Sequence, residues 1–306
     1  IGTLFSQNHM ISDLYINRPV SDYVGLISYK SGGSVYGVRL ADVNITGRYQ
    51  VGGMIGQSSA STLIKLAVQS GTVTGSQGLA PANPNAPGNT IVGGIVGWLR
   101  DGSTLTNSYN SATVSGAVSI GGLVGDLGGS LGPTTVVATS YNAGTVMGPS
   151  GASFIGGIAG YSNNGSISTS YNTGLVTVSG PGSSVGGLVG SVQDIATSIT
   201  NVYNAGPVVV GSGSSNIGGL VGNMLLGTVT DAFSYGTIVA PASSNVGGLV
   251  GANGAGVTNS FWNTETSGQG SSSAGTGLTT SAMMTATTFS GAGWDMTTEW
   301  NIINTE

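Results

Sequence analysis

The sequence predicts an all-β fold: a β-solenoid (parallel β-helix) of about nine coils of about 30 residues, with a C-terminal capping segment. A short apolar strand flanked by glycines, most often Gly-Gly-Leu-Val-Gly, recurs along the 306 residues. Repeats at such intervals are typical of solenoids, in which each unit buries its apolar face against its neighbours. A helix is disfavoured because each glycine costs about 1 kcal/mol relative to alanine inside a helix. Clear copies begin at Gly52, Gly93, Gly121, Gly156, Gly186, Gly218 and Gly247, and degenerate copies lie at Val24–Ile27 and Ile1–Phe5.

The glycine-flanked strand is the first element of each unit, and it is apolar on both faces. In Gly121–Gly125, Leu123 and Val124 point to opposite sides of the strand because side chains alternate along an extended backbone. We expect another segment of the same coil to cover the second face. The alternative is an apolar stripe that stays exposed for lateral contact with another rod.

The second element of each unit carries an aliphatic and an aromatic residue four positions apart, usually followed by asparagine. Both side chains then lie on one face of a strand, and stacking the coils places equivalent residues above one another. We expect an aromatic column and an amide ladder, because stacked side chains can satisfy one another from coil to coil. The column would contain Tyr109, Tyr141, Tyr171, Tyr203, Phe233 and Phe261, and the ladder Asn110, Asn142, Asn172 and Asn204.

The third element is a short β-branched strand. It reads Gly-Thr-Val at 71–73 and 144–146, Ala-Thr-Val at 112–114 and Gly-Thr-Ile at 236–238. Gly, Asn and Ser, which favour turns, separate it from the second element. Three short strands joined by such turns make up one coil.

We divide the chain into degenerate repeats at 1–50, regular repeats at 51–268 and a C-terminal cap or assembly segment at 269–306. Trp294 and Trp300 are expected to anchor the last segment onto the final coil and hide its exposed edge. Leu4 and Phe5 lie in a first strand that is expected to leave an unpaired edge. Either further coils of a longer protein or another subunit, in a head-to-tail contact, would cover that edge.

Composition excludes several classes of partner and site. Six Lys and Arg against eleven Asp and Glu give a formal charge of −5, which is a poor surface for nucleic acid. No apolar run approaches the roughly 18 residues of a membrane-spanning helix. The absence of cysteine excludes disulfides and thiolate metal sites.

Side chains able to perform catalysis are sparse. The single histidine, His9, is expected in a surface loop, and no His-Glu-x-x-His zinc motif occurs. Asp101, Asp126 and Asp194 each follow the glycine that closes a repeat strand, so they are weak calcium candidates on one edge. We therefore predict no catalytic residue, no cofactor and no metal, and a protein that is not an enzyme.

The phrase Gly-Gly-Leu-Val-Gly, followed about twenty residues later by Asn-Ser-Tyr-Asn-x-Gly-x-Val, resembles the GLUG-motif repeat of bacterial surface proteins. The resemblance covers about residues 51–268 and implies an extracellular or cell-surface structural or adhesive role, with no catalytic residues to transfer.

We accordingly expect a rod in a surface appendage, self-assembling filament or adhesin stalk, with copies of itself or further repeats as partners. The alternative is an adhesion module that binds a glycan or a cell surface through loops on one face. The best loop is Gly75–Thr90, and the tryptophans can stack on sugars.

Overall fold

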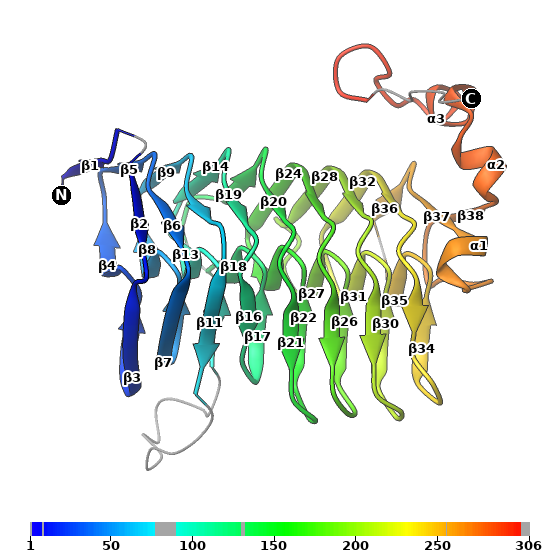
Figure 1. Cartoon of the computed structure of the whole chain (residues 1–306). Helices are drawn as coiled ribbons and strands as arrows, with labels where there is room; N and C mark the ends of the chain where they lie inside the picture. Colours follow the sequence, from blue (N-terminus) through cyan, green and yellow to red (C-terminus); the bar gives the residue numbers. More distant parts are fainter. Residues whose placement is uncertain (1, 8, 77–89, 130–131, 255, 301–306) are drawn as a thin grey trace.

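The computed structural model describes residues 2–7, 9–76, 90–129, 132–254 and 256–300, and it confirms the predicted β-solenoid. Strands of successive turns pair in parallel and form three sheets of 16, 14 and 8 strands. Figure 1 shows the turns stacked along one axis, from β1–β4 at one end to β34 and β35 at the other. The core consists of columns of Val, Ile and Leu from each turn, most of them fully buried.

The eight-stranded sheet holds the glycine-flanked strands and contains one strand from each turn, so the described residues form about eight turns. Its strands are β4 (Ile27–Ser31), β8 (Ile55–Ser59), β13 (Val96–Arg100), β18 (Val124–Gly128), β23 (Ala159–Asn163), β27 (Val189–Val192), β31 (Val221–Met224) and β35 (Val250–Asn253).

The prediction of nine coils was too high by one, because Ile1–Phe5 is not a copy of this strand. Leu4 pairs with Val35 in the 16-stranded sheet, which is the position of the aliphatic residue in the second element of each unit. A five-residue apolar segment with one glycine fits both the glycine-flanked strand and the second element of the unit, so its sequence alone does not identify which of the two it forms.

The 16-stranded sheet holds the second element of each unit. One column contains β1 (Thr3–Phe5), β5 (Ser34–Tyr36), β9 (Thr62–Ile64), β14 (Thr104–Thr106) and β19 (Thr135–Ala138). A parallel column contains β2 (Met10–Ser12), β6 (Arg39–Ala41), β10 (Ala67–Val68), β15 (Tyr109–Asn110) and β20 (Tyr141–Asn142). The two columns merge in β24 (Gly165–Asn172), which is followed by β28 (Ser198–Asn204), β32 (Thr228–Ser234), β36 (Val257–Thr258), β37 (Phe261–Asn263) and β38 (Thr276–Leu278).

The 14-stranded sheet begins with two long strands and then divides into two arms. The long strands are β3 (Tyr15–Val24) and β7 (Val43–Gly52). The third elements form one arm: β11 (Gly71–Gly75), β16 (Thr113–Ser115), β21 (Val146–Gly148), β25 (Val176–Val178), β29 (Val208–Val210) and β33 (Ile238–Val239). The other arm leads into the glycine pairs: β12 (Val92–Gly93), β17 (Val118–Gly121), β22 (Ser153–Gly156), β26 (Ser183–Gly186), β30 (Ser215–Gly218) and β34 (Ser244–Gly247). Residue 50, where we placed a boundary, lies inside β7, and strand pairing continues across it.

The second face of the glycine-flanked strand is covered. Leu123 and Val124 are both 0% exposed. A Cβ placed on Gly160 in β23 would collide with the backbone of Ser119 and Ile120 in β17, in the preceding turn. The eight-stranded sheet therefore packs at backbone distance on the 14-stranded sheet, and the apolar stripe is not free for contact between rods.

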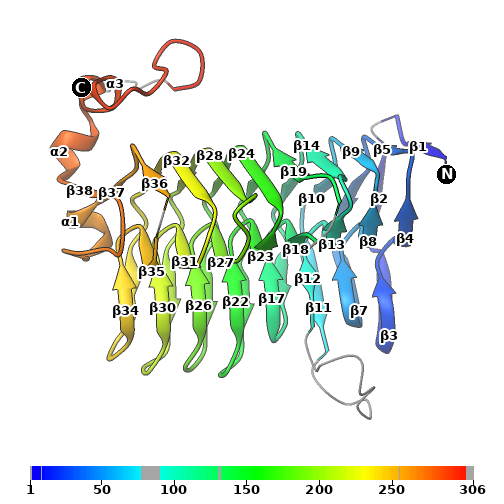
Figure 2. The ribbon, with the colours of Figure 1, turned by 180° about the vertical axis from the view of Figure 1, so that it is seen from behind.

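Three short helices follow the last full turn: α1 (Thr264–Ser267), α2 (Thr280–Met283) and α3 (Ala286–Gly291). Figures 1 and 2 show α1 at the end of the stack, whereas the segment with α3 projects over the side that carries β32 and β36. Within the described part of the chain, no helix has the length and apolar character needed to cross a membrane.

Candidate functional site

The four ladder asparagines form one buried chain of hydrogen bonds. Nδ2 of Asn110 donates to Oδ1 of Asn142 at 2.9 Å. Nδ2 of Asn142 donates to Asn172 at 2.8 Å, and Nδ2 of Asn172 donates to Asn204 at 2.9 Å. All four side chains are 0% exposed, and each also bonds the backbone two residues ahead in its own turn. The amides are thus occupied in holding turns together and offer no free group to a ligand.

Five rings of the predicted column stack with nearly parallel planes. The centroid distances are 5.1 Å for Tyr109–Tyr141, 5.0 Å for Tyr141–Tyr171, 4.8 Å for Tyr171–Tyr203 and 5.1 Å for Tyr203–Phe233. Burial, together with the neighbouring Tyr171 and Tyr235, raises the pKa of Tyr203 to about 12. Phe261 is in register with Phe233, but its ring meets Phe289 edge-on at 5.6 Å instead of continuing the stack.

Trp294 and Trp300 both hold the C-terminal segment, but their contacts lie on the side of the solenoid and not on the terminal edge that they were expected to hide. Nε1 of Trp300 donates to Oδ1 of Asn201 at 3.3 Å, and its ring lies 5.5 Å from that of Phe233. Trp294 is 4% exposed and donates to the backbone oxygen of Asn259 at 2.7 Å. Both tryptophans therefore attach the C-terminal segment to the side of the solenoid, over the end of the aromatic column.

A different tryptophan closes the last turn. Trp262 is 6% exposed and lies against Gly248, where a Cβ would collide with its ring. Its Nε1 donates to the backbone oxygen of Gln269 at 2.9 Å. The next residues add edge contacts, since the backbone N–H of Gly248 donates to Ser271 at 3.0 Å. Part of the strand edge is covered in this way.

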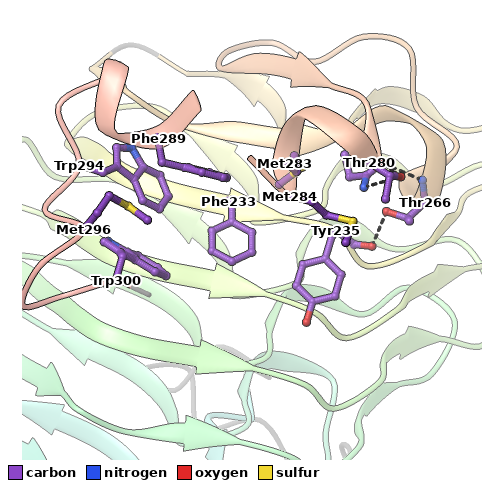
Figure 3. A pocket seen from close by; sticks show the side chains of 11 residues that line it. Phe233, Tyr235, Thr266, Thr280, Met283, Met284, Phe289, Trp294, Met296 and Trp300 are labelled. Atoms are coloured by element: carbon purple, nitrogen blue, oxygen red, sulfur yellow. Dashed lines mark hydrogen bonds between the residues drawn. The ribbon is translucent and has the colours of Figure 1, made fainter. Parts of the chain in front are cut away.

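A pocket of about 290 Å³ lies where the folded-back segment meets the column (Figure 3). Aromatic rings and methionine side chains form most of its wall. Its polar residues already bond one another: Thr266 Oγ1 donates to the Tyr235 carbonyl at 2.7 Å, and Asn263 Nδ2 donates to Thr280 Oγ1 at 3.0 Å. The lining residues are Phe233, Tyr235, Asn263, Thr266, Thr280, Met283, Met284, Phe289, Trp294, Met296 and Trp300.

This pocket can take up an apolar ring or chain, but it contains no nucleophile beside a base. Sequence reasoning did not find it, because Met283, Met284 and Met296 fall outside the repeat pattern. The one sequence feature that could have indicated the pocket is the closeness of these methionines to Trp294 and Trp300 in the chain.

The remaining candidate residues lie apart from one another. Phe5 is 58% exposed and stacks on Tyr36 at 5.0 Å, and Leu4 beside it is 42% exposed. His9 is exposed between β1 and β2. In the loop Gly75–Thr90, residues 77–89 lie outside the described residues.

The three aspartates proposed as weak calcium candidates make separate local contacts. Asp101 accepts from Ser59 at 2.7 Å and pairs with Arg100 at 2.8 Å. Asp194 accepts from the backbone N–H of Ala196 at 2.7 Å, and Asp126 lies in the middle of β18. Among the residues that the structure describes, no group of three or more His, Cys, Asp or Glu side chains could hold a metal ion.

Comparison with known proteins finds a similar curated sequence and a similar solved fold. No protein-family model matches the chain. Over 130 residues, 42% of this chain, the sequence is 33% identical to Halomucin of Haloquadratum walsbyi, of which the match covers 1%. The fold is similar to the crystal structure of a Bacteroides ovatus protein provisionally assigned as an immunoglobulin A1 protease, with a TM-score of 0.54 and 16% identity. That similarity covers 94% of this chain and 71% of the other, and it shows the fold alone.

Proposed function

We propose that this chain is a non-enzymatic structural segment of an extracellular surface protein, in which the solenoid acts as a rigid rod. The observation that carries the proposal is the unbroken parallel pairing from the first turn to β37, with the asparagine ladder and the tyrosine column in the same register. Because each turn is bonded to the next along three sheets, bending the rod would break many hydrogen bonds at once.

Two similarities support a surface location. The match to a small part of Halomucin is consistent with a repeat segment inside a very long protein. The GLUG-like phrases, which no family model matches, suggest the same class of surface protein. We propose further repeats or copies of the same chain as partners of the rod, in an appendage, a filament or an adhesin stalk.

Imaging of the purified chain at native concentration by cryo-electron microscopy tests the rod. We expect straight particles with axial layering of about 4.8 Å, either as separate short rods or joined into fibres. Fibres would identify a filament and separate rods a stalk. Bent or globular particles would contradict the proposal. Incubation with immunoglobulin A1 should leave that antibody intact, and specific cleavage would show an enzyme instead.

The pocket in Figure 3 favours a second candidate function, an adhesion module that captures an apolar part of a ligand. Titration with the dye 1-anilinonaphthalene-8-sulfonate, followed by its fluorescence, should give saturable binding that Trp300→Ala weakens. Equal binding by both proteins would remove this candidate and leave the rod proposal unaffected.

A further inference from the structure

A second row of aromatic and polar side chains lies on the face of the eight-stranded sheet, away from the pocket. Each turn contributes one side chain to this row, and each of these side chains is polar, at least partly exposed, or both. The register of the paired strands places them above one another. The row reads Tyr29, Gln57, Trp98, Asp126, Tyr161, Ser191, Asn223 and Ala252.

A companion row along the 14-stranded sheet lies beside it and consists of Tyr23, Gln50, Ile91, Ser119 and Phe154. The Tyr23 and Tyr29 rings meet edge to face at 6.5 Å, and those of Phe154 and Tyr161 at 5.6 Å. Between these pairs, Ser119 lies beside Asp126 and lowers the pKa of its carboxyl group, which burial raises. We call the two rows, from Tyr23 and Tyr29 to Phe154 and Tyr161, the seam.

Aromatic and polar residues alternate along the first five turns of the seam. Tyr29, Trp98 and Tyr161 stand on the first, third and fifth turns, so they are about 10 Å apart, twice the spacing of neighbouring strands. Gln57 and Asp126 occupy the turns between them. This interval is close to the two-sugar repeat of an extended β-linked pyranose chain. Successive sugars in such a chain turn opposite faces to one side, so every second sugar presents the same apolar face.

The aromatic side chains are accessible and held in place. Tyr29 is 51% exposed, and Trp98 and Tyr161 are partly exposed. Nε1 of Trp98 donates to the backbone oxygen of Gly128 at 2.8 Å, and Arg100 packs over its ring at 4.4 Å. Fixed aromatic rings are suitable platforms for the C–H faces of sugars, because little side-chain freedom is lost on binding.

Hydrogen-bond acceptors in the seam lack partners. Oε1 of Gln50 and Oδ1 of Asp126 are buried and accept no hydrogen bond within the described residues. Buried acceptors of this kind are normally satisfied by protein or by ordered water. A sugar hydroxyl is a donor that can replace such water. At the N-terminal end, a shallow cavity of about 530 Å³ lined by Asp22, Tyr23, Ser28, Tyr29 and Gln57 opens onto the same rows.

The charges beside the seam favour an uncharged chain. Arg48 pairs with Asp22 at 2.6 Å and Arg100 with Asp101 at 2.8 Å, so these two cations are already neutralised. An anionic polysaccharide would meet Asp126 without a free cation from either arginine.

We propose that the seam binds an extended, uncharged, β-linked polysaccharide lying along the rod axis. Tyr29, Trp98 and Tyr161 stack on every second sugar, and Gln50 and Asp126, whose acceptor oxygens lack partners, accept hydrogen bonds from the hydroxyl groups between them.

The test is isothermal titration of the whole chain with cellohexaose, and with maltohexaose as the α-linked control. We expect cellohexaose to bind, and maltohexaose to bind at least tenfold more weakly because its curved chain cannot reach successive platforms. Tyr29→Ala, at an exposed position, and Asp126→Leu, which removes both acceptor oxygens at a similar side-chain volume, should each weaken cellohexaose binding about tenfold while circular dichroism stays unchanged.

Trp300→Ala at the pocket and Met147→Ala at an exposed position of β21 should bind cellohexaose like the unmodified chain. Absence of cellohexaose binding, equal affinity for both sugars, or wild-type affinity in both seam variants would overturn the proposal. Loss of binding in Trp300→Ala alone would assign the sugar to the pocket and also overturn it.

Discussion

The side-chain amide of Asn142 donates from Nδ2 to Oδ1 of Asn172 at 2.8 Å, although 30 residues separate the two along the chain. That separation is one turn of the solenoid, and both side chains are 0% exposed. The same amide accepts from Asn110 on the other side, so it bonds both neighbouring turns. A shift in register by one residue would break both bonds and leave buried amides unpaired, so the ladder fixes how the turns stack.

Asn142→Ala should therefore be strongly destabilising. It removes one of the two hydrogen bonds that Nδ2 of Asn110 and Oδ1 of Asn172 each make, and a buried polar group that loses a partner costs about 1–3 kcal/mol. We expect a loss of about 2–4 kcal/mol in the free energy of unfolding, measured by urea denaturation. Asn223→Ala is the matched control: its Oδ1 accepts from Nδ2 of Asn253 at 2.8 Å on the exposed surface, so the loss should be below about 1 kcal/mol. Equal losses would show that the buried ladder contributes nothing special.

Gly122→Ala tests the close approach of the turns at the glycine pair. A Cβ there would collide with the carbonyl oxygen of Gly157 and with the Asn142 side chain. Neither neighbour can move without disturbing the ladder, so we expect a loss of more than about 3 kcal/mol or failure to fold. Gly129→Ala, where a Cβ meets nothing within 4 Å, should behave like the unmodified chain. Thermal unfolding of the three proteins side by side measures the difference.

A left-handed backbone corner between the two columns of the 16-stranded sheet offers a stabilising change. Thr169 has φ of 46°, which β-branched residues tolerate poorly, whereas Asn107 and Asn201 adopt 51° and 54° at the equivalent position. Thr169→Asn should raise the free energy of unfolding by about 0.5–1 kcal/mol. Thr177→Asn in β25, where φ is not positive, provides the comparison and should give no gain. Destabilisation by Thr169→Asn would mean that a contact of the threonine side chain contributes more to the free energy of unfolding than the relief of backbone strain does.

Asp126 should make stability depend on pH. Burial raises the pKa of its carboxyl group to about 7, although Ser119 lowers it in part. The groups around it are the Tyr49 and Tyr161 hydroxyls, whose own pKa values the carboxylate raises, and the Trp98 ring. Because the folded pKa exceeds the unfolded one of about 4, the stabilisation by the protonated form is complete below about pH 4 and is lost as pH rises through 7.

Asp126→Asn removes this dependence. Raising the pKa of a carboxyl group from about 4 to about 7 corresponds to roughly 4 kcal/mol, and the partial exposure of the Asp126 side chain reduces this value. We therefore expect the stability of the variant, measured relative to the unmodified chain, to be about 1–3 kcal/mol higher at pH 8 than at pH 4. Denaturation at both pH values measures the gain. A stability difference between the two proteins that is the same at both pH values would mean that the carboxyl group titrates normally.

The repeat pattern predicted the buried asparagine ladder and the partly exposed aromatic column in detail. Asn110 to Asn204 bond one another and Tyr109 to Phe233 stack because identical residues at equal intervals have only one way to meet when turns stack in register. Prediction was poorest at the two ends. Ile1–Phe5 was placed in the wrong sheet, and Trp294 and Trp300 were placed over the terminal edge that Trp262 covers.

By itself, the sequence determined the period, the parallel stacking and the ladders, since each follows from local alternation repeated at a fixed interval. Only the tertiary structure decided which surfaces remain open. The pocket joins Phe233, inside the repeats, to Trp300, which lies 67 residues further on and outside them. The seam joins side chains from two sheets that occupy different positions of the repeat. Such contacts depend on how the sheets pack and on where the chain folds back. Packing and folding back depend in turn on how side chains of different volume fit together, and the repeat period of a sequence does not contain that information.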